Sequence, residues 1–258
     1  MRVIVTRPLQ QAQTTVAALR GQGIDAVALP LIDIVPAQDV QPLQQAWREL
    51  ERFACVMFVS ANAVLHFMHQ RPLQRVWPLQ VLAASTGPGT SQALRQAGVP
   101  ALALVEPAAE VFDSEALWQR LKDRDWTARR VLVVRGESGR DWLAEQLGAA
   151  GAQLQFVAAY GRAAPTFDAA GQALLGQALA QPSAHLWAFS SAQALGHLQK
   201  LAHGADWSGA RAVVSHPRIA DSARQMGFGQ VELGQVTPDA LAAALRVAQG
   251  RHLQLRAP

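Results

Sequence analysis

The segment "WAFSSAQALGHL" (residues 187–198) joins an apolar run to two serines and then to the start of a helical pattern. A similar succession, with one serine, occurs upstream in "VMFVSANAVLHF" (residues 56–67). Short, almost uninterrupted apolar runs are typical of strands buried on both faces of a parallel sheet. Each segment therefore predicts a buried strand whose carboxyl end leads through serine into a helix.

Similar apolar runs alternate with longer amphipathic segments along the whole chain, which is typical of α/β proteins. The segment at 25–35 contains Pro30, which predicts a bend or an interruption there. Buried strands are predicted at residues 2–6, 25–35, 55–60, 78–84, 129–135, 152–160, 185–190 and 209–215. The sequence therefore predicts parallel sheets flanked by helices.

The chain also resembles itself at long range. Arg7 and Gly23 recur as Arg135 and Gly151, 128 residues further on. Other landmarks keep the same order at nearly the same spacing. They pair Phe58 with Phe189, Ser60 with Ser191, Pro88 with Pro217, and Gly98 with Gly227. This pattern predicts two similar α/β halves, roughly 1–128 and 129–258, because a solenoid would need a far shorter period.

Two linker-like stretches suggest that these halves differ from the spatial domains. "PAQDVQP" (36–42) and "YGRAAPTFD" (160–168) are rich in residues that interrupt helices and strands. We therefore expect one discontinuous domain from residues 1–36 and 162–258, and an inserted domain from residues 37–161.

The composition is typical of a folded cytoplasmic protein. Half of the 258 residues are hydrophobic and the formal net charge is +4, so disorder is not expected. No apolar run reaches the ~20 residues of a membrane-spanning helix, and the start of the chain does not resemble an export signal. Cys55 is the single cysteine, so no disulfide can form within the chain. No basic run suggests a nucleic-acid partner.

Several common kinds of active site are poorly supported. The chain has no G-x-S-x-G motif and no lysine-containing phosphate loop, since "STGPGT" (85–90) lacks the lysine. His66 and His69 share a helix face, but no carboxylate accompanies them as a metal ligand. We therefore do not expect a metal site.

The strand-to-helix turns are better suited to binding anions. Ligands of parallel sheets bind beyond the carboxyl ends of the strands, where helix N-termini offer free N–H groups. An alternative interpretation is that the serines and asparagine only cap these helices. Because the turns come in two similar sets, the sequence predicts a ligand cleft between two domains.

Seven segments, in order, resemble the uroporphyrinogen-III synthase family over nearly the whole chain. They are "VIVTRP", "FVSANAV", "STGPGTSQAL", "VLVVRGESGRDWL", "LQFVAAYGR", "FSSAQAL" and "VSHPRIADSARQMG". The resemblance implies two α/β domains joined by a two-stranded linker. It also implies a cofactor-free enzyme that cyclises hydroxymethylbilane to uroporphyrinogen III, with loss of water and inversion of ring D through a spiro intermediate. For the oligomeric state, we expect a monomer.

The resemblance further implies site residues. Tyr160 would be the catalytic acid, with packing in the linker as its alternative role. Substrate carboxylates would be bound, partly through backbone N–H groups, by Arg7, Ser60, Ala61, Asn62, Thr86, Gly87, Thr90, Ser190, Ser191, Ser215, His216, Arg218 and Ile219.

Two other functions fit the same architecture. A two-domain binding protein for an anionic small molecule would share the duplicated fold, but most such proteins carry an export signal. A nucleotide-sugar transferase would be expected to show a diphosphate-binding signature, and none is present.

Overall fold

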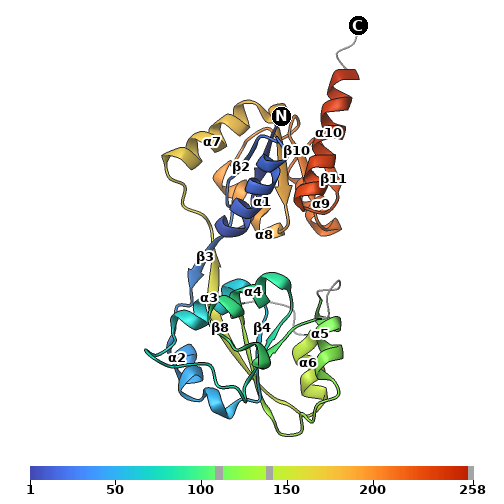
Figure 1. Ribbon diagram of the computed structural model, residues 1–258. Coiled ribbons are helices and arrows are strands. Elements are labelled where there is room, and N and C mark those ends of the chain that lie inside the picture. The colour runs from blue at the N-terminus through green and yellow to red at the C-terminus, as the bar shows by residue number, and fades with distance from the viewer. Residues whose placement is uncertain (108–112, 138–141, 255–258) are drawn as a thin grey trace. The chain divides into compact units, whose positions relative to one another are not determined.

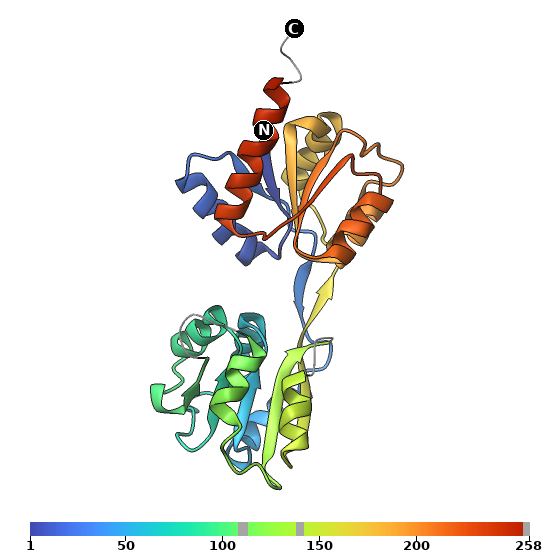
Figure 2. The ribbon, with the colours of Figure 1, turned by 90° about the vertical axis from the view of Figure 1, so that its right-hand side faces the viewer.

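The computed structural model describes residues 1–107, 113–137 and 142–254 (Figures 1 and 2). Residues 138–141 of the quoted segment "VLVVRGESGRDWL" lie outside this description. The chain forms two compact units: unit 1 comprises residues 1–33 and 163–258, and unit 2 comprises residues 34–162.

Unit 1 contains a five-stranded sheet in the order β11-β10-β9-β1-β2, and neighbouring strands are parallel. The register pairs Val5 of β1 with Ala188 of β9, and Phe189 of β9 with Val214 of β10. The carboxyl ends of these three strands therefore lie at one edge of the sheet. The strands are β1 (Arg2–Val5), β2 (Ala26–Ala28), β9 (His185–Phe189), β10 (Arg211–Val214) and β11 (Gln230–Leu233).

Helices cover both faces of this sheet. They are α1 (Leu9–Gly21), α7 (Ala169–Ala180), α8 (Ala192–Leu201), α9 (Pro217–Gln225) and α10 (Pro238–Gln254), with a short 3-10 helix at Pro182–Ala184. Helices α1 and α10 pack on Val3 and Val5 of β1, on the opposite side from α9 (Figure 2). The other face holds a cluster of four aromatic rings, Trp187, Phe189, Trp207 and Phe228. Alternate strand residues thus supply two cores, as expected for a sheet buried on both faces.

Unit 2 contains a six-stranded sheet in the order β3-β8-β7-β4-β5-β6. Phe58 of β4 pairs with Val134 of β7 and Ser85 of β5, so these strands also end at one edge. A bulge at Arg135/Gly136 lets Gly136 pair with Tyr160. The strands are β3 (Asp33–Pro36), β4 (Cys55–Phe58), β5 (Leu82–Ser85), β6 (Leu104–Val105), β7 (Arg130–Gly136) and β8 (Gln153–Ala163).

The helices of unit 2 bury two separate cores against its sheet. They are α2 (Gln41–Arg48), α3 (Ala61–His69), α4 (Pro88–Gln96), α5 (Ser114–Leu121) and α6 (Trp142–Ala149), with 3-10 helices at Leu50–Arg52 and Ala101–Ala103. One core contains Trp47, Phe58 and Phe67, and the other contains Cys55 and Leu117. Fully burying one such large apolar side chain stabilises the fold by about 1.5–3 kcal/mol.

The predicted α/β class with two similar units is confirmed. The five strands of unit 1 follow the same order as five strands of the sheet in unit 2. In this order, β1 and β2 occupy the positions that β7 and β8 occupy in unit 2. The two sequence halves have therefore exchanged their first strand-helix-strand segments. The breaks fall after residues 33 and 162 rather than 36 and 161, since β3 lies in the sheet of unit 2.

Two short strands, β6 and β11, were not predicted from the sequence. The segment at 25–35 forms two strands, β2 and β3, as Pro30 suggested. Within the described residues, no helix is both long and apolar enough to cross a membrane.

Candidate active site

The predicted site residues follow the carboxyl ends of neighbouring strands in each unit. In unit 2, the turns after β4 and β5 and the end of β8 bring together Ser60, Ala61, Asn62, Thr86, Gly87, Thr90 and Tyr160. In unit 1, the turns after β1, β9 and β10 bring together Arg7, Ser190, Ser191, Ser215, His216, Arg218 and Ile219. The cleft expected between two domains stays a prediction.

Ser60 caps α3, as the alternative interpretation predicted. Its backbone is extended and its Oγ accepts the N–H of Ala63 at 3.1 Å. Within the described residues, the N–H groups of Ala61 and Asn62 have no hydrogen-bond partner. The first turn of α3 therefore keeps donors for a ligand even though it has a cap.

Helix α4 begins without a side-chain cap. Gly87 is its N-cap residue, with extended backbone, and Pro88 follows at the first helical position. The Thr86 hydroxyl donates to the Val59 carbonyl at 3.4 Å. This N-terminus is open, and its positive dipole end suits a carboxylate.

Thr90, which was predicted as a ligand contact, is largely buried. It is 6% exposed, and its N–H donates to the Gly87 carbonyl at 3.0 Å. Thr90 faces the interior from the first turn of α4, and its role as a ligand contact stays a prediction.

Tyr160 is buried, with 3% of its surface exposed, and packs in the core under α3. Its hydroxyl lies 3.2 Å from Ser60 Oγ. Its ring stacks on His66, with centroids 6.0 Å apart and an interplanar angle of 27°. Tyr160 therefore packs in the core, and its hydroxyl also lies at the turn after β4.

Gly136 leaves space for this ring. A Cβ atom at Gly136 would lie 3.0 Å from Tyr160 Cζ and 3.3 Å from its hydroxyl oxygen. Sequence reasoning missed Gly136 and the contact of His66, because the bulge that pairs Gly136 with Tyr160 leaves no local signal.

The electrostatics around Tyr160 favour a neutral imidazole. Burial lowers the pKa of His66 below its usual value, and the nearby His69 lowers it further. Desolvation disfavours the charged form of a histidine.

In unit 1, Arg7 lies two residues beyond the end of β1 and is half-buried. Among the described residues, its Nε is a buried donor with no hydrogen-bond partner. Burial also lowers the pKa of Arg7 from its usual value. An unpaired donor on a partly desolvated guanidinium would be satisfied by an anion. The preceding Thr6 is structural, because its Oγ1 donates to the Ala188 carbonyl at 2.7 Å.

The N-termini of α8 and α9 differ from each other. Ser191 is the N-cap residue of α8 but makes no side-chain cap hydrogen bond, and Ser190 is exposed. His216 caps α9 through Nδ1, which accepts the N–H of Arg218 at 3.2 Å. The expected serine cap is therefore absent from α8, whose first turn is open.

The remaining predicted residues of unit 1 lie around α9. Ser215 and Arg218 are exposed. Ile219 is 6% exposed, and its N–H donates to the His216 carbonyl at 2.9 Å. That donor is engaged at the start of α9, and the role of Ile219 as a ligand contact stays a prediction.

No metal site appears in the part of the chain that the structure describes, since no three metal-ligating side chains gather there. Cys55 is buried, and burial raises the pKa of its thiol to about 12. A protonated, enclosed thiol is a poor nucleophile.

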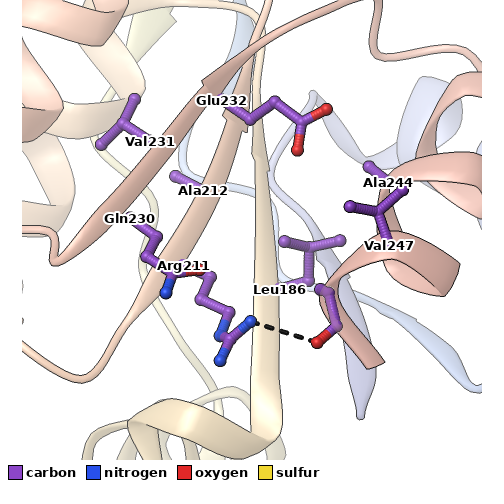
Figure 3. A pocket seen from close by; sticks show the side chains of 9 residues that line it. Leu186, Arg211, Ala212, Gln230, Val231, Glu232, Ala244 and Val247 are labelled. Carbon is purple, nitrogen blue, oxygen red and sulfur yellow. Dashed lines mark hydrogen bonds between the residues drawn. The ribbon is translucent and has the colours of Figure 1, made fainter. Parts of the chain in front are cut away.

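A cavity of about 450 Å³ in unit 1 lies elsewhere, beside the first residues of β9, β10 and β11 and the helix α10 (Figure 3). Arg211 in its wall donates from Nη1 to the Ala248 carbonyl at 3.3 Å. Ala212, Glu232 and Val247 also line it. None of the predicted site residues contributes to this cavity.

Comparisons with known proteins agree with the resemblance. The family model for uroporphyrinogen-III synthase HemD matches residues 13–243. Uroporphyrinogen-III synthases of Salmonella typhimurium and Escherichia coli are each 28% identical to this chain, covering 95% of it and their own full length.

Solved structures show the same fold. A uroporphyrinogen-III synthetase from Helicobacter pylori gives a TM-score of 0.55 at 18% identity, covering 99% of this chain and 100% of its own. A mutant uroporphyrinogen III synthase from Thermus thermophilus gives 0.54 at 17% identity, covering 97% and 99%. With the family model matching most of its length, this chain belongs to the uroporphyrinogen-III synthase family.

Proposed function

We propose that this chain converts hydroxymethylbilane into uroporphyrinogen III, losing water, inverting ring D through a spiro intermediate and closing the macrocycle. Membership of the family supports the reaction class. The observation in this structure that supports the proposal is the Tyr160 hydroxyl, held 3.2 Å from Ser60 Oγ at the edge of the sheet where strands lead into helices.

The helix N-termini would bind the acetate and propionate arms of the substrate. Those of α4 and α8 have no side-chain cap, and among the described residues nothing accepts the N–H groups of Ala61 and Asn62 at the start of α3. Carboxylates are stabilised at such termini by the N–H groups and by the helix dipole. Arg7 would add a charged donor in unit 1.

The substrate can close on its own to the isomer without inversion, so the enzyme must favour one conformation. Fixing the tetrapyrrole so that the substituted carbon of ring D is attacked would lower the barrier to the inverted product. Acid catalysis adds to this effect if a proton donor lies near the leaving hydroxyl group.

Tyr160 would be that donor. Its O–H bond breaks as the proton passes to the substrate hydroxyl oxygen, and the C–O bond breaks with its electron pair leaving in water. The pyrrole nitrogen delocalises the charge that remains. A proton is released later, when ring closure restores the last pyrrole, and returns to the phenolate. We propose that the protein does this as a cytoplasmic monomer without metal or cofactor.

The Tyr160→Phe variant tests this role. We expect kcat for isomer III to fall by roughly tenfold to a hundredfold, with KM within about twofold, because the acid acts mainly in the transition state. Chromatography of the oxidised products measures both isomers. An unchanged kcat would remove Tyr160 from the mechanism.

A further inference from the structure

The two hydroxyls of Ser60 and Tyr160 share one hydrogen bond, in which either can donate. Ser60 Oγ also accepts the N–H of Ala63 at 3.1 Å. The direction of the shared bond decides whether the Tyr160 proton is free. If Tyr160 donates to Ser60, its proton is engaged and cannot reach a substrate.

We infer that Ser60 is a positioning residue that donates its proton to Tyr160 Oη during the reaction. This inference rests on the proposed function. In that direction, the O–H of Tyr160 is free to point to the leaving hydroxyl group of the substrate. Ser60 keeps one acceptor lone pair on the Ala63 N–H, so both of its hydrogen-bonding roles are met.

The same bond strengthens as the proton leaves. When Tyr160 gives its proton to the substrate hydroxyl group, which leaves as water, its oxygen becomes a phenolate, and Ser60 still donates to it. A hydrogen bond to an ionised acceptor is shorter and roughly twice as strong as one between neutral groups. Ser60 therefore stabilises the transition state more than the ground state, which raises kcat.

Two neighbours determine where the phenol ring lies. Gly136 leaves room for the ring, because a Cβ there would lie 3.0 Å from Tyr160 Cζ, and His66 stacks on the ring. The ring is buried, so the position of its hydroxyl is set by packing rather than by the substrate.

Ser60 also caps α3, so the experiment must separate a lost cap from a lost donor. Ser60→Ala removes both, whereas Ser60→Thr keeps a hydroxyl for both. Asp113→Ala is a matched control in the same unit, because Asp113 Oδ1 caps α5 by accepting the N–H of Ala116 at 2.7 Å. Asp113 has no part in the proposed site.

Steady-state kinetics of isomer III formation, with hydroxymethylbilane generated in situ, give the first test. We expect Ser60→Ala to lower kcat about tenfold with KM within about twofold, since hydrogen bonds to charged groups are stronger than neutral ones. Ser60→Thr should recover most of kcat. Asp113→Ala should lower the melting temperature while kcat stays unchanged.

A double-mutant cycle gives the second test. Because Ser60 acts through the Tyr160 hydroxyl, Ser60→Ala should lower kcat little further in the Tyr160→Phe background. An equal loss in both backgrounds would overturn the inference. A rise in KM alone would also overturn it, because that result assigns Ser60 to substrate binding.

Tyr160 is the single tyrosine of the chain, so a readout besides activity is available. Protein labelled with ¹³C at the tyrosine Cζ gives one side-chain resonance. We expect it to move in Ser60→Ala, to return toward its wild-type position in Ser60→Thr and to stay in place in Asp113→Ala. A resonance that does not move in Ser60→Ala would contradict the hydrogen bond between Ser60 and Tyr160.

The outcomes separate this inference from the proposed function. If the wild-type chain forms no isomer III, the proposed function fails and the inference with it. If the wild-type chain forms isomer III while the Ser60 and Tyr160 effects are additive, only the inference fails.

Discussion

Residues around Tyr160 show how packing positions the hydroxyl that we propose as the proton donor. The ring fills the space that Gly136 leaves, stacks on His66 and presents its hydroxyl to Ser60. Tyr160 was assigned through the family resemblance, whereas Ser60 also follows from the local pattern of a strand end that leads into a helix. Gly136 and His66 could not be assigned a role, because their contacts depend on a bulge and on the pairing of distant strands.

Gly136→Ala tests the fit of this ring. The added Cβ would lie 3.0 Å from Tyr160 Cζ, so the ring must move by a few tenths of an ångström. We expect a loss of stability of about 1–3 kcal/mol from overpacking, and a fall in kcat of roughly tenfold.

Gly176→Ala is the control for this change, because it lies in α7 and its Cβ would meet no atom within 4 Å. It should stabilise the protein by up to about 1 kcal/mol and leave kcat unchanged. Thermal melts and kinetics of both variants measure the contrast. Full activity and stability in Gly136→Ala would show that the Tyr160 ring does not need the space that Gly136 leaves.

His66 predicts a pH dependence of stability. Burial lowers its pKa in the folded state, so the unfolded chain binds more protons and stability is lost as the pH falls below about 6.5. His66→Phe keeps an aromatic ring on Tyr160 but cannot titrate. We expect the melting temperature of the wild type to fall more than that of His66→Phe between pH 7.5 and 5.5. Parallel melting curves would argue against this effect.

At the scale of elements, the open helix N-termini carry the proposed recognition of carboxylates. Helix α3 has a cap, whereas α4 begins at Gly87 and α8 at Ser191 without a side-chain cap. The sequence predicted these helix starts, and capping by the serines was the alternative interpretation, which holds for Ser60 but not for Ser191. Whether an oxygen reaches a free N–H depends on the side-chain rotamer, which sequence does not specify.

Gly87→Asp separates stability from binding at α4. The site has extended backbone, and a Cβ would meet no atom within 4 Å, so aspartate fits. Its carboxylate would cap α4 and stabilise unit 2 by about 0.5–1 kcal/mol. It would also occupy the N–H groups proposed for the substrate, so KM should rise several-fold.

Gly87→Ala is the matched control, since it adds a Cβ without a carboxylate and should leave KM near the wild-type value. Kinetics and melts of both variants are the measurement. A stabilised Gly87→Asp enzyme with unchanged KM would show that α4 does not bind the substrate.

Short strands at the sheet edges also escaped prediction. Strand β6 has two residues, and β11 exposes Gln230, Glu232 and Leu233, so neither shows the apolar run of a buried strand. Their positions are determined by pairing with β5 and β10.

At the scale of the whole molecule, the duplication was visible because landmarks recur at 128 to 131 residues. The exchange of the first strand-helix-strand segments was suggested only by two linkers, because strand order depends on non-local pairing. The fold class could therefore be predicted from the sequence, whereas the assignment of β3 to unit 2 could not.

The charge of the molecule gives a further prediction. The chain carries a formal charge of +4, and the proposed substrate is a polyanion. Raising monovalent salt from about 0.05 to about 0.5 M shortens the screening length more than twofold, so KM should rise several-fold while kcat changes little. Initial rates across this range measure the effect. A KM independent of salt would contradict binding dominated by carboxylate contacts.

The most direct test of the proposed function is the isomer ratio formed from hydroxymethylbilane generated in situ, with this protein present or absent. Products are oxidised and separated by chromatography. Predominant isomer III in the presence of the protein, against isomer I in its absence, is the predicted result. Isomer I alone, from protein shown by circular dichroism to be folded, would contradict the assignment.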